Sequence, residues 1–348
     1  MHYENLGRTG VRVSRLCLGA MMFGAMGNRD RADCVRMVHR ALDAGINFID
    51  TADVYSQGES EEIVGEALVG RREPVVLATK FWGQMGDDPN RRGSSRRWIA
   101  QAVEGSLRRL RTDVIDLYQM HRFDETTDVE EPLAALTDLV RAGKIRSFGI
   151  STWSADRIVE AHWTAERRGL LRPRCEQSPY SILRRRIERT VLPTCQRYGM
   201  GMIVWSPLEG GWLSGRYLAP EDFRPDTRVV SFGKYWGGFD LSAPENQRRL
   251  AIVRELDQLA KKIGIPLSRL AIAWTLVHPG VTAAIIGPRT REQLEDLLAD
   301  PDRALEPAIL DEIDRLVPPG TNVNPFDPSS DPVSLQPAAR RRPRAAAR

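Results

Sequence analysis

Four ionisable residues of this sequence have types and a spacing that suit chemistry on a carbonyl group. Asp50 and Tyr55 follow an apolar, β-prone stretch that begins at Ile46, and Lys80 and His121 each end a later apolar stretch. A lysine cation beside a tyrosine hydroxyl stabilises the phenolate, and an aspartate keeps that lysine charged and aimed. Singly, each residue could be a capping acid, a packed aromatic, a solvated strand end or a polar packing group. Together they predict Tyr55 as general acid, a tuning pair, and a histidine that hydrogen-bonds the carbonyl oxygen.

Eight short apolar segments, each followed by a stretch with helical periodicity, run through the chain. The predicted strands cover residues 16–20, 46–50, 75–80, 114–121, 145–151, 174–177, 201–206 and 282–287. Such an unbroken alternation favours a (β/α)8 TIM barrel of the α/β class. A doubly wound sheet is disfavoured because the stretch from Gly19 to Gly24 lacks the G-x-G-x-x-G spacing of a dinucleotide-binding turn.

The barrel would bring the four ionisable residues together. Active sites of TIM barrels lie at the carboxyl ends of the strands. Asp50, Lys80 and His121 end the second, third and fourth predicted strands, and Tyr55 lies in the loop after the second. All four side chains are therefore expected to face one cleft.

Further elements are predicted at both ends of the chain. Residues 2–14 alternate like an N-terminal β-hairpin with a turn near 8–10. Extra C-terminal helices are expected near 245–263, 267–278 and 307–316. Residues 1–317 should form a single barrel domain. Residues 318–348 should be a mobile tail, because a Pro-, Ala- and Arg-rich composition buries too little apolar area to offset the cost of ordering.

Composition narrows the class of protein. Hydrophobic residues make up 42% and charged residues 28% of 348, as in soluble globular proteins. The net charge of +4 owes much to the arginines of the tail, so no nucleic acid and no anionic membrane is expected as a partner. No apolar stretch suits a membrane span or a signal core, which predicts a cytoplasmic protein. Nothing compels an oligomer, so a monomer is the default.

Cysteines and histidines give no sign of a metal site. The sequence has five histidines without an H-E-x-x-H motif, and four widely spaced cysteines without a C-x-x-C pair. The cysteines are expected to be reduced and structural, and they are Cys17, Cys34, Cys175 and Cys195.

The segment GINFIDTADVYSQGESEEIVGEAL resembles the signature of the aldo-keto reductases, and the similarity extends over roughly residues 2–316. The pattern is closer to the bacterial and potassium-channel-β branch than to the vertebrate steroid and aldose reductases. The family's catalytic tetrad falls on Asp50, Tyr55, Lys80 and His121. The resemblance implies a barrel that binds NADP(H), and direct hydride transfer to an aldehyde or ketone, with Tyr55 delivering the proton.

The resemblance also implies a nicotinamide site. Ser151 and Gln177 match the residues that hold the carboxamide, and Trp205 matches the aromatic that stacks on the ring. Thr152 stands where the family has asparagine, which keeps a hydroxyl but loses the amide.

Two further segments resemble the family's phosphate sites. WSPLEGGWLSGRY implies that the pyrophosphate is lined by Ser206, Leu208, Gly210 and Leu213, although a Gly-rich surface loop is the alternative. IGPRTREQ is similar to the adenosine-phosphate segment and implies contacts from Gly287, Arg289, Thr290 and Gln293. A charged side chain and N–H groups at a helix start suit a 2′-phosphate. Leu297 stands where the family has the asparagine of its adenine contact.

Two long loops are expected to shape the substrate site. Loop 82–94 supplies Trp82 and Met85, and loop 207–243 supplies Trp236. The aromatics of loop 207–243 could equally form a small core of their own, and they are Trp212, Tyr217, Phe232, Tyr235, Trp236 and Phe239. The substrate is expected to be a small-molecule carbonyl compound. The alternatives are a nucleotide-linked keto-deoxysugar and, in another class, a cofactor-sensing regulatory subunit of the potassium-channel-β type.

Overall fold

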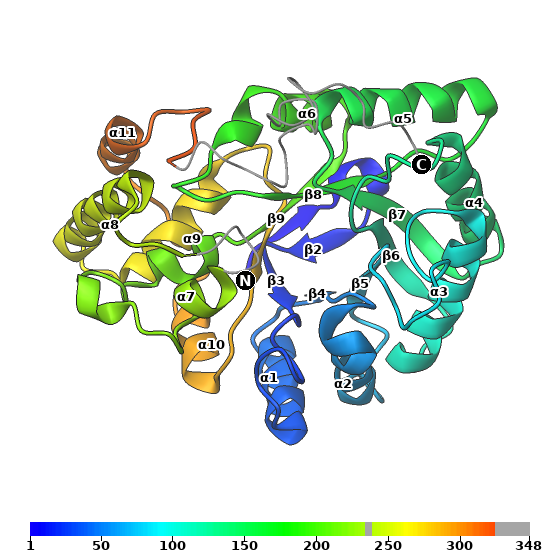
Figure 1. Ribbon diagram of the computed structural model, residues 1–348, viewed down its shortest axis with the longest axis horizontal. Helices are drawn as coiled ribbons and strands as arrows, with labels where there is room; N and C mark the ends of the chain where they lie inside the picture. Colours follow the sequence, from blue (N-terminus) through cyan, green and yellow to red (C-terminus); the bar gives the residue numbers. More distant parts are fainter. Residues whose placement is uncertain (234–238, 324–348) are drawn as a thin grey trace, which may run out of the picture.

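The computed structural model describes residues 1–233 and 239–323, and eight parallel strands in it close into a barrel. The strands follow one another around the barrel, and the last pairs with both the first and the seventh (Figure 1). They are β3 (Leu16–Gly19), β4 (Phe48–Asp50), β5 (Val76–Phe81), β6 (Ile115–Met120), β7 (Ile145–Ser151), β8 (Cys175–Pro179), β9 (Gly201–Trp205) and β10 (Ala283–Ile286). The predicted fold class is confirmed.

Helices surround the barrel (Figure 1), and three of them begin at a side chain that caps the helix. Asp30, Ser95 and Thr290 each accept a hydrogen bond from a backbone N–H in the first turn of the helix that follows. The helices are α1 (Arg31–Asp43), α2 (Glu59–Ala67), α3 (Arg96–Leu110), α4 (Glu130–Arg141), α5 (Ala155–Arg168), α6 (Val191–Tyr198), α7 (Arg228–Gly233), α8 (Pro244–Lys262), α9 (Leu267–Val277), α10 (Arg291–Leu298) and α11 (Pro307–Leu316). The helix predicted near 186–198 is split, because Thr190 leaves helical geometry between the short turn η3 (Arg186–Arg189) and α6.

The amino end of the barrel is closed by the predicted hairpin of β1 (Tyr3–Asn5) and β2 (Arg12–Ser14). Leu6 and Val13 pack against a buried layer to which seven of the eight strands contribute. That layer consists of Cys17, Phe48, Ala78, Leu117, Cys175, Ile203 and Ala283. Gly7 makes this approach possible, because a Cβ there would lie 2.4 Å from the backbone nitrogen of Gly201. The hairpin thus covers the amino end of the described barrel, opposite the strand ends at which the site is predicted.

The inward-facing layer nearer the carboxyl end is polar. Strand residues two apart point the same way. A second inward-facing ring is therefore formed by the residues that stand two positions after Phe48, Ala78, Leu117 and Cys175. That ring contains Asp50, Lys80, Gln119 and Gln177. All four side chains are buried, so each polar group there needs a partner.

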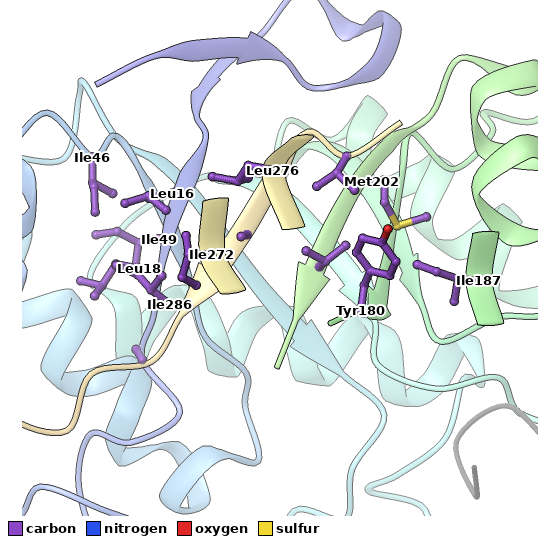
Figure 2. Packing of buried hydrophobic residues seen from close by; sticks show 14 of the residues in the cluster. Leu16, Leu18, Ile46, Ile49, Tyr180, Ile187, Met202, Ile272, Leu276 and Ile286 are labelled. Atoms are coloured by element: carbon purple, nitrogen blue, oxygen red, sulfur yellow. The ribbon is translucent and has the colours of Figure 1, made fainter. Parts of the chain in front are cut away.

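Between strands and helices lies the main apolar core. Figure 2 shows Leu16 and Leu18 of β3 and Ile286 of β10 in one buried cluster with Ile272 of α9. Burying each such side chain stabilises the fold by roughly 1.5–3 kcal/mol. The four cysteines are buried with free thiols, which agrees with a structural role.

The loop after β9 folds onto itself. The ring of Phe223 lies 5.0 Å from that of Trp212, 5.2 Å from that of Tyr217 and 5.3 Å from that of Phe239, measured between centroids. The predicted alternative of a small aromatic core is therefore confirmed for these residues, with Phe223 at its centre. The described part of the chain does not include Tyr235, Trp236 or the side chain of Phe232. The predicted substrate contact of Trp236 therefore falls on a residue outside it.

Packing continues past the expected domain boundary at 317. The backbone nitrogen of Arg185 donates to the oxygen of Thr321, and that of Val323 donates to Leu183. Val323 is buried. Residues 318–323 thus belong with the barrel, and residues 324–348 of the predicted tail lie outside the described residues. Within residues 1–233 and 239–323, no helix combines the length and apolarity needed to span a membrane.

Candidate active site

Lys80 is the centre of a buried hydrogen-bonded group. Its ammonium donates to Asp50 Oδ1 at 2.5 Å, to the Thr51 carbonyl at 2.8 Å and to the Tyr55 hydroxyl at 3.2 Å. Burial alone disfavours the cation, but Asp50 and Tyr55 outweigh it and raise the pKa of Lys80 above its ordinary value. Lys80 is therefore charged, and its charge lies next to the phenol oxygen.

The second oxygen of Asp50 is held by two amides. Gln177 Nε2 donates to Asp50 Oδ2 at 2.8 Å, and Gln119 Nε2 donates to the same oxygen at 3.1 Å. Gln119 was not among the predicted site residues. Its signal in the sequence is its position two residues before His121, which places both on one face of the extended segment. The carboxylate is consequently fixed from three sides.

Tyr55 and His121 come from the segments that follow β4 and β6, and their rings are in contact. Tyr55 opens the short turn η2 (Tyr55–Gly58), and its ring meets that of His121 edge-on at 5.7 Å between centroids. Burial, and then the cations of Lys80 and Arg122, hold the pKa of His121 well below its usual range. A neutral imidazole can donate a hydrogen bond to a carbonyl oxygen without competing as an acid. The four predicted catalytic residues are thus brought together.

The loop after β7 is held in a strained conformation. Thr152 has φ of 62°, a left-handed value that a β-branched side chain rarely adopts. Glu176 Oε1 accepts the backbone N–H groups of Thr152 at 2.7 Å and Trp153 at 3.3 Å, and the Ser178 hydroxyl at 2.7 Å. Ser151 donates to the Gln177 carbonyl at 2.9 Å. The predicted nicotinamide loop therefore rests on Glu176, a buried acid that was not among the predicted site residues.

Backbone strain is concentrated at this end of the barrel. Among residues with positive φ that are not glycine, Trp82, Ser206 and Glu209 join Thr152 in loops that follow strands. Each costs about 1–3 kcal/mol, which the surrounding structure must supply. Trp82 is half-buried. Met85 is buried and lines a cavity to which none of the four catalytic candidates contributes.

The loop after β9 offers an accessible backbone. Gly210 has φ of 66°, and no atom lies within 4 Å of where its Cβ would be. Gly287, after β10, is equally open. Open glycine backbone lets a phosphate approach N–H groups closely, so both positions fit a dinucleotide. Trp205, Ser206 and Leu208 are half-buried nearby in the chain, whereas the side chain of Leu213 is fully buried.

The charges of two arginines, Arg289 and Arg228, influence each other. Arg289 precedes Thr290, the N-cap residue of α10. The backbone N–H of Arg289 donates a hydrogen bond to Gln293 Oε1 at 2.8 Å. Burial and the nearby charge of Arg289 lower the pKa of Arg228, a residue of α7 that was not predicted. Two neighbouring guanidinium groups suit an anion with more than one charge. Leu297, which stands where the family has the asparagine of its adenine contact, is buried.

No cluster of three His, Cys, Asp or Glu side chains suited to a metal ion occurs in the described part of the chain. The fit to a dinucleotide instead comes from the open glycines, the strained loops and the paired arginines.

The family model for the aldo/keto reductase family matches residues 15–318. An uncharacterized oxidoreductase, YrpG, from Bacillus subtilis is 39% identical over 91% of this chain and 96% of its own length. A probable voltage-gated potassium channel subunit beta from Oryza sativa is 38% identical over 91% of this chain and 97% of its own. A putative voltage-gated potassium channel subunit beta from Schizosaccharomyces pombe is 36% identical over 90% of this chain and 93% of its own length.

Proposed function

Because this chain belongs to the aldo/keto reductase family, we propose that it reduces an aldehyde or ketone to an alcohol with NADPH. The observation that carries the proposal is the Lys80 ammonium, which binds Asp50 and the Tyr55 hydroxyl together. The family generally uses nicotinamide cofactors, and NADPH when bound supplies the hydride to the carbonyl carbon.

The residues of the chain supply the proton and its control. Tyr55 donates its hydroxyl proton to the carbonyl oxygen as the hydride arrives, which leaves a phenolate. The Lys80 cation at 3.2 Å stabilises that phenolate, and Asp50 keeps the cation aimed. Neutral His121 donates a hydrogen bond that orients the carbonyl. Tyr55 regains its proton from water once the alcohol has left.

The cofactor would be held by groups around the same rim. Ser151 and Gln177 are assigned to the carboxamide, and Trp205 to the nicotinamide face. Arg289 and Arg228 favour NADPH over NADH, because their paired charges suit the additional 2′-phosphate.

A panel of aldehydes, ketones and nucleotide-linked keto-deoxysugars, followed by loss of NADPH absorbance, tests the reaction. Turnover of at least one carbonyl class, and its loss in Tyr55→Phe, is expected. Tight NADPH binding without turnover of any class would refute reduction.

The second candidate, a regulatory subunit, rests on the names of the rice and fission-yeast relatives. The assembled tetrad is what carbonyl reduction requires, so reduction is placed first.

A further inference from the structure

A cavity of about 470 Å³ lies along α3, apart from the four catalytic candidates. Its walls come from α3, from the loop after β5 and from the loop that leads to Tyr55. The groups that matter for its chemistry are Asp53, Met85, Arg91, Trp98, Arg108 and Arg109. Its size falls in the range of about 300–1,000 Å³ typical of small-molecule sites.

Asp53 is the unexplained group in this cavity. Its side chain is 1% exposed, and neither carboxyl oxygen has a hydrogen-bond partner among the described residues. Its backbone N–H donates to the Lys80 carbonyl at 3.1 Å, which fixes its position. A buried polar group without a partner is costly, and a ligand that hydrogen-bonds to it recovers that cost.

The charges around the cavity favour an anion. Arg109 is neutralised by Glu61, whose carboxylate lies 2.7 Å away, and Glu104 at the cavity edge is paired with Lys144. Burial and the charge of Glu61 raise the pKa of Asp53 to about 8, so Asp53 is largely neutral at pH 7.

Positive charge is left over at the cavity edge. Within residues 1–233 and 239–323, neither Arg91 nor Arg108 forms an ion pair, and both are exposed. The Arg91 guanidinium lies over the ring of Trp98 at 5.7 Å. Met85 and Trp98, which are both buried, form an apolar part of the cavity wall that also includes Arg91 and Arg108.

We propose that this cavity binds a small organic carboxylate. The ligand's charge meets Arg91 and Arg108, its hydrocarbon body contacts Met85 and Trp98, and Asp53 hydrogen-bonds to it from the buried end. The site does not depend on the proposed reductase activity. Because Asp53 lies two residues before Tyr55, an occupied cavity also supports the loop that carries Tyr55.

Isothermal titration of the NADPH-saturated protein with 6-methoxy-2-naphthoate tests the site, with 6-methoxy-2-naphthamide as the neutral probe. The ether oxygen of both probes can accept a hydrogen bond from Asp53 at the buried end. Binding of the carboxylate is expected, with Kd at least tenfold weaker for the amide and for the double variant Arg91→Ala/Arg108→Ala. Arg97→Ala is the matched control, because Arg97 is an exposed residue of α3 outside the cavity. It should bind as the wild type does.

Asp53→Asn gives an independent readout through pH. Asp53 is influenced by Glu61 of α2, Lys80 of β5, Arg109 of α3 and Tyr118 of β6. As pH rises from 7 to 9.5, Asp53 ionises and the wild type should lose affinity severalfold, while Asp53→Asn should not. The probe stays ionised throughout, since carboxylic acids titrate near pH 4.

Absence of 6-methoxy-2-naphthoate binding to the wild type overturns the proposal. So does binding that survives Arg91→Ala/Arg108→Ala, or binding lost in Tyr55→Phe, which would place the probe in the catalytic cleft. Failure of the reductase assay changes none of these titrations, so the two proposals fail separately.

Discussion

Gln177 donates its side-chain amide to Asp50 at 2.8 Å, so a residue expected to hold the nicotinamide also supports the catalytic carboxylate. The proposed cofactor site and the proposed proton donor thus share one hydrogen-bonded layer. Asp50 connects Gln177 to Lys80, and Lys80 connects Asp50 to Tyr55.

Tyr55→Phe should lower kcat by about 10²–10⁴-fold, the usual contribution of a general acid. NADPH affinity should stay within about twofold, because the phenol oxygen contacts Lys80 and not the predicted cofactor residues. Steady-state kinetics and a fluorescence titration check both. Tyr198→Phe on α6 is the control, and full activity in Tyr55→Phe would end the assignment.

Gln119→Leu should lower kcat by about tenfold or more. The lost hydrogen bond to charged Asp50 is worth roughly 1.5–3 kcal/mol. The KM for NADPH should change less than kcat, since Gln177 keeps its 2.8 Å hydrogen bond to Asp50 when its 3.2 Å bond to Gln119 is lost. A change confined to KM, with kcat intact, would contradict this role.

Lys80→Met should destabilise the protein by about 3–5 kcal/mol, because it leaves Asp50 buried and unpaired. Adding Asp50→Asn should restore most of that loss while activity stays absent. Urea denaturation measures both. Lys144→Met, which breaks a surface pair with Glu104, should cost no more than about 1 kcal/mol. Equal stability of Lys80→Met and of Lys80→Met combined with Asp50→Asn would show that the unpaired Asp50 carboxylate is not the cause of the destabilisation.

Arg289→Ala should raise the Kd for NADPH by about 10–100-fold and the Kd for NADH much less. Charge-assisted hydrogen bonds to phosphate are worth roughly 1.5–3 kcal/mol. Arg228→Ala should act in the same direction, and the exposed Arg197→Ala should not. Equal weakening for both cofactors would remove the 2′-phosphate assignment.

Glu176→Gln should change how stability depends on pH. Burial, despite three hydrogen bonds, raises the pKa of Glu176 to about 8 from the 4.5 of an unperturbed glutamate. Between those values the folded state holds a proton that the unfolded state releases, so ionisation of Glu176 destabilises the fold as pH rises. The Tm of Glu176→Gln should therefore gain on that of the wild type from pH 5 to 8. Glu166→Gln, on the exposed face of α5, should show no such gain.

The barrel and its four catalytic candidates could be predicted because both depend on local patterns. The ends of predicted strands placed Asp50, Lys80 and His121 at one rim with Tyr55 in the adjacent loop, and the family resemblance implied the same four residues. Gln119, Glu176 and Arg228 were missed for a physical reason. Their partners Asp50, Thr152 and Arg289 lie 69, 24 and 61 positions away in sequence, respectively. The residue pattern within one strand or helix does not show which distant residue it will contact. The side chain of Leu213 is fully buried, and the contact of this residue with a pyrophosphate stays a prediction.

The hairpin beneath the barrel has a kinetic consequence. Leu6, Val13 and the Gly7–Gly201 contact close the amino end of the described barrel. If Tyr55 is the acid that we propose, its fresh proton and the departing alcohol both have to use the carboxyl end. Recharging of the acid and release of the product would then be coupled in time. A solvent isotope effect on turnover should then track product release as well as chemistry.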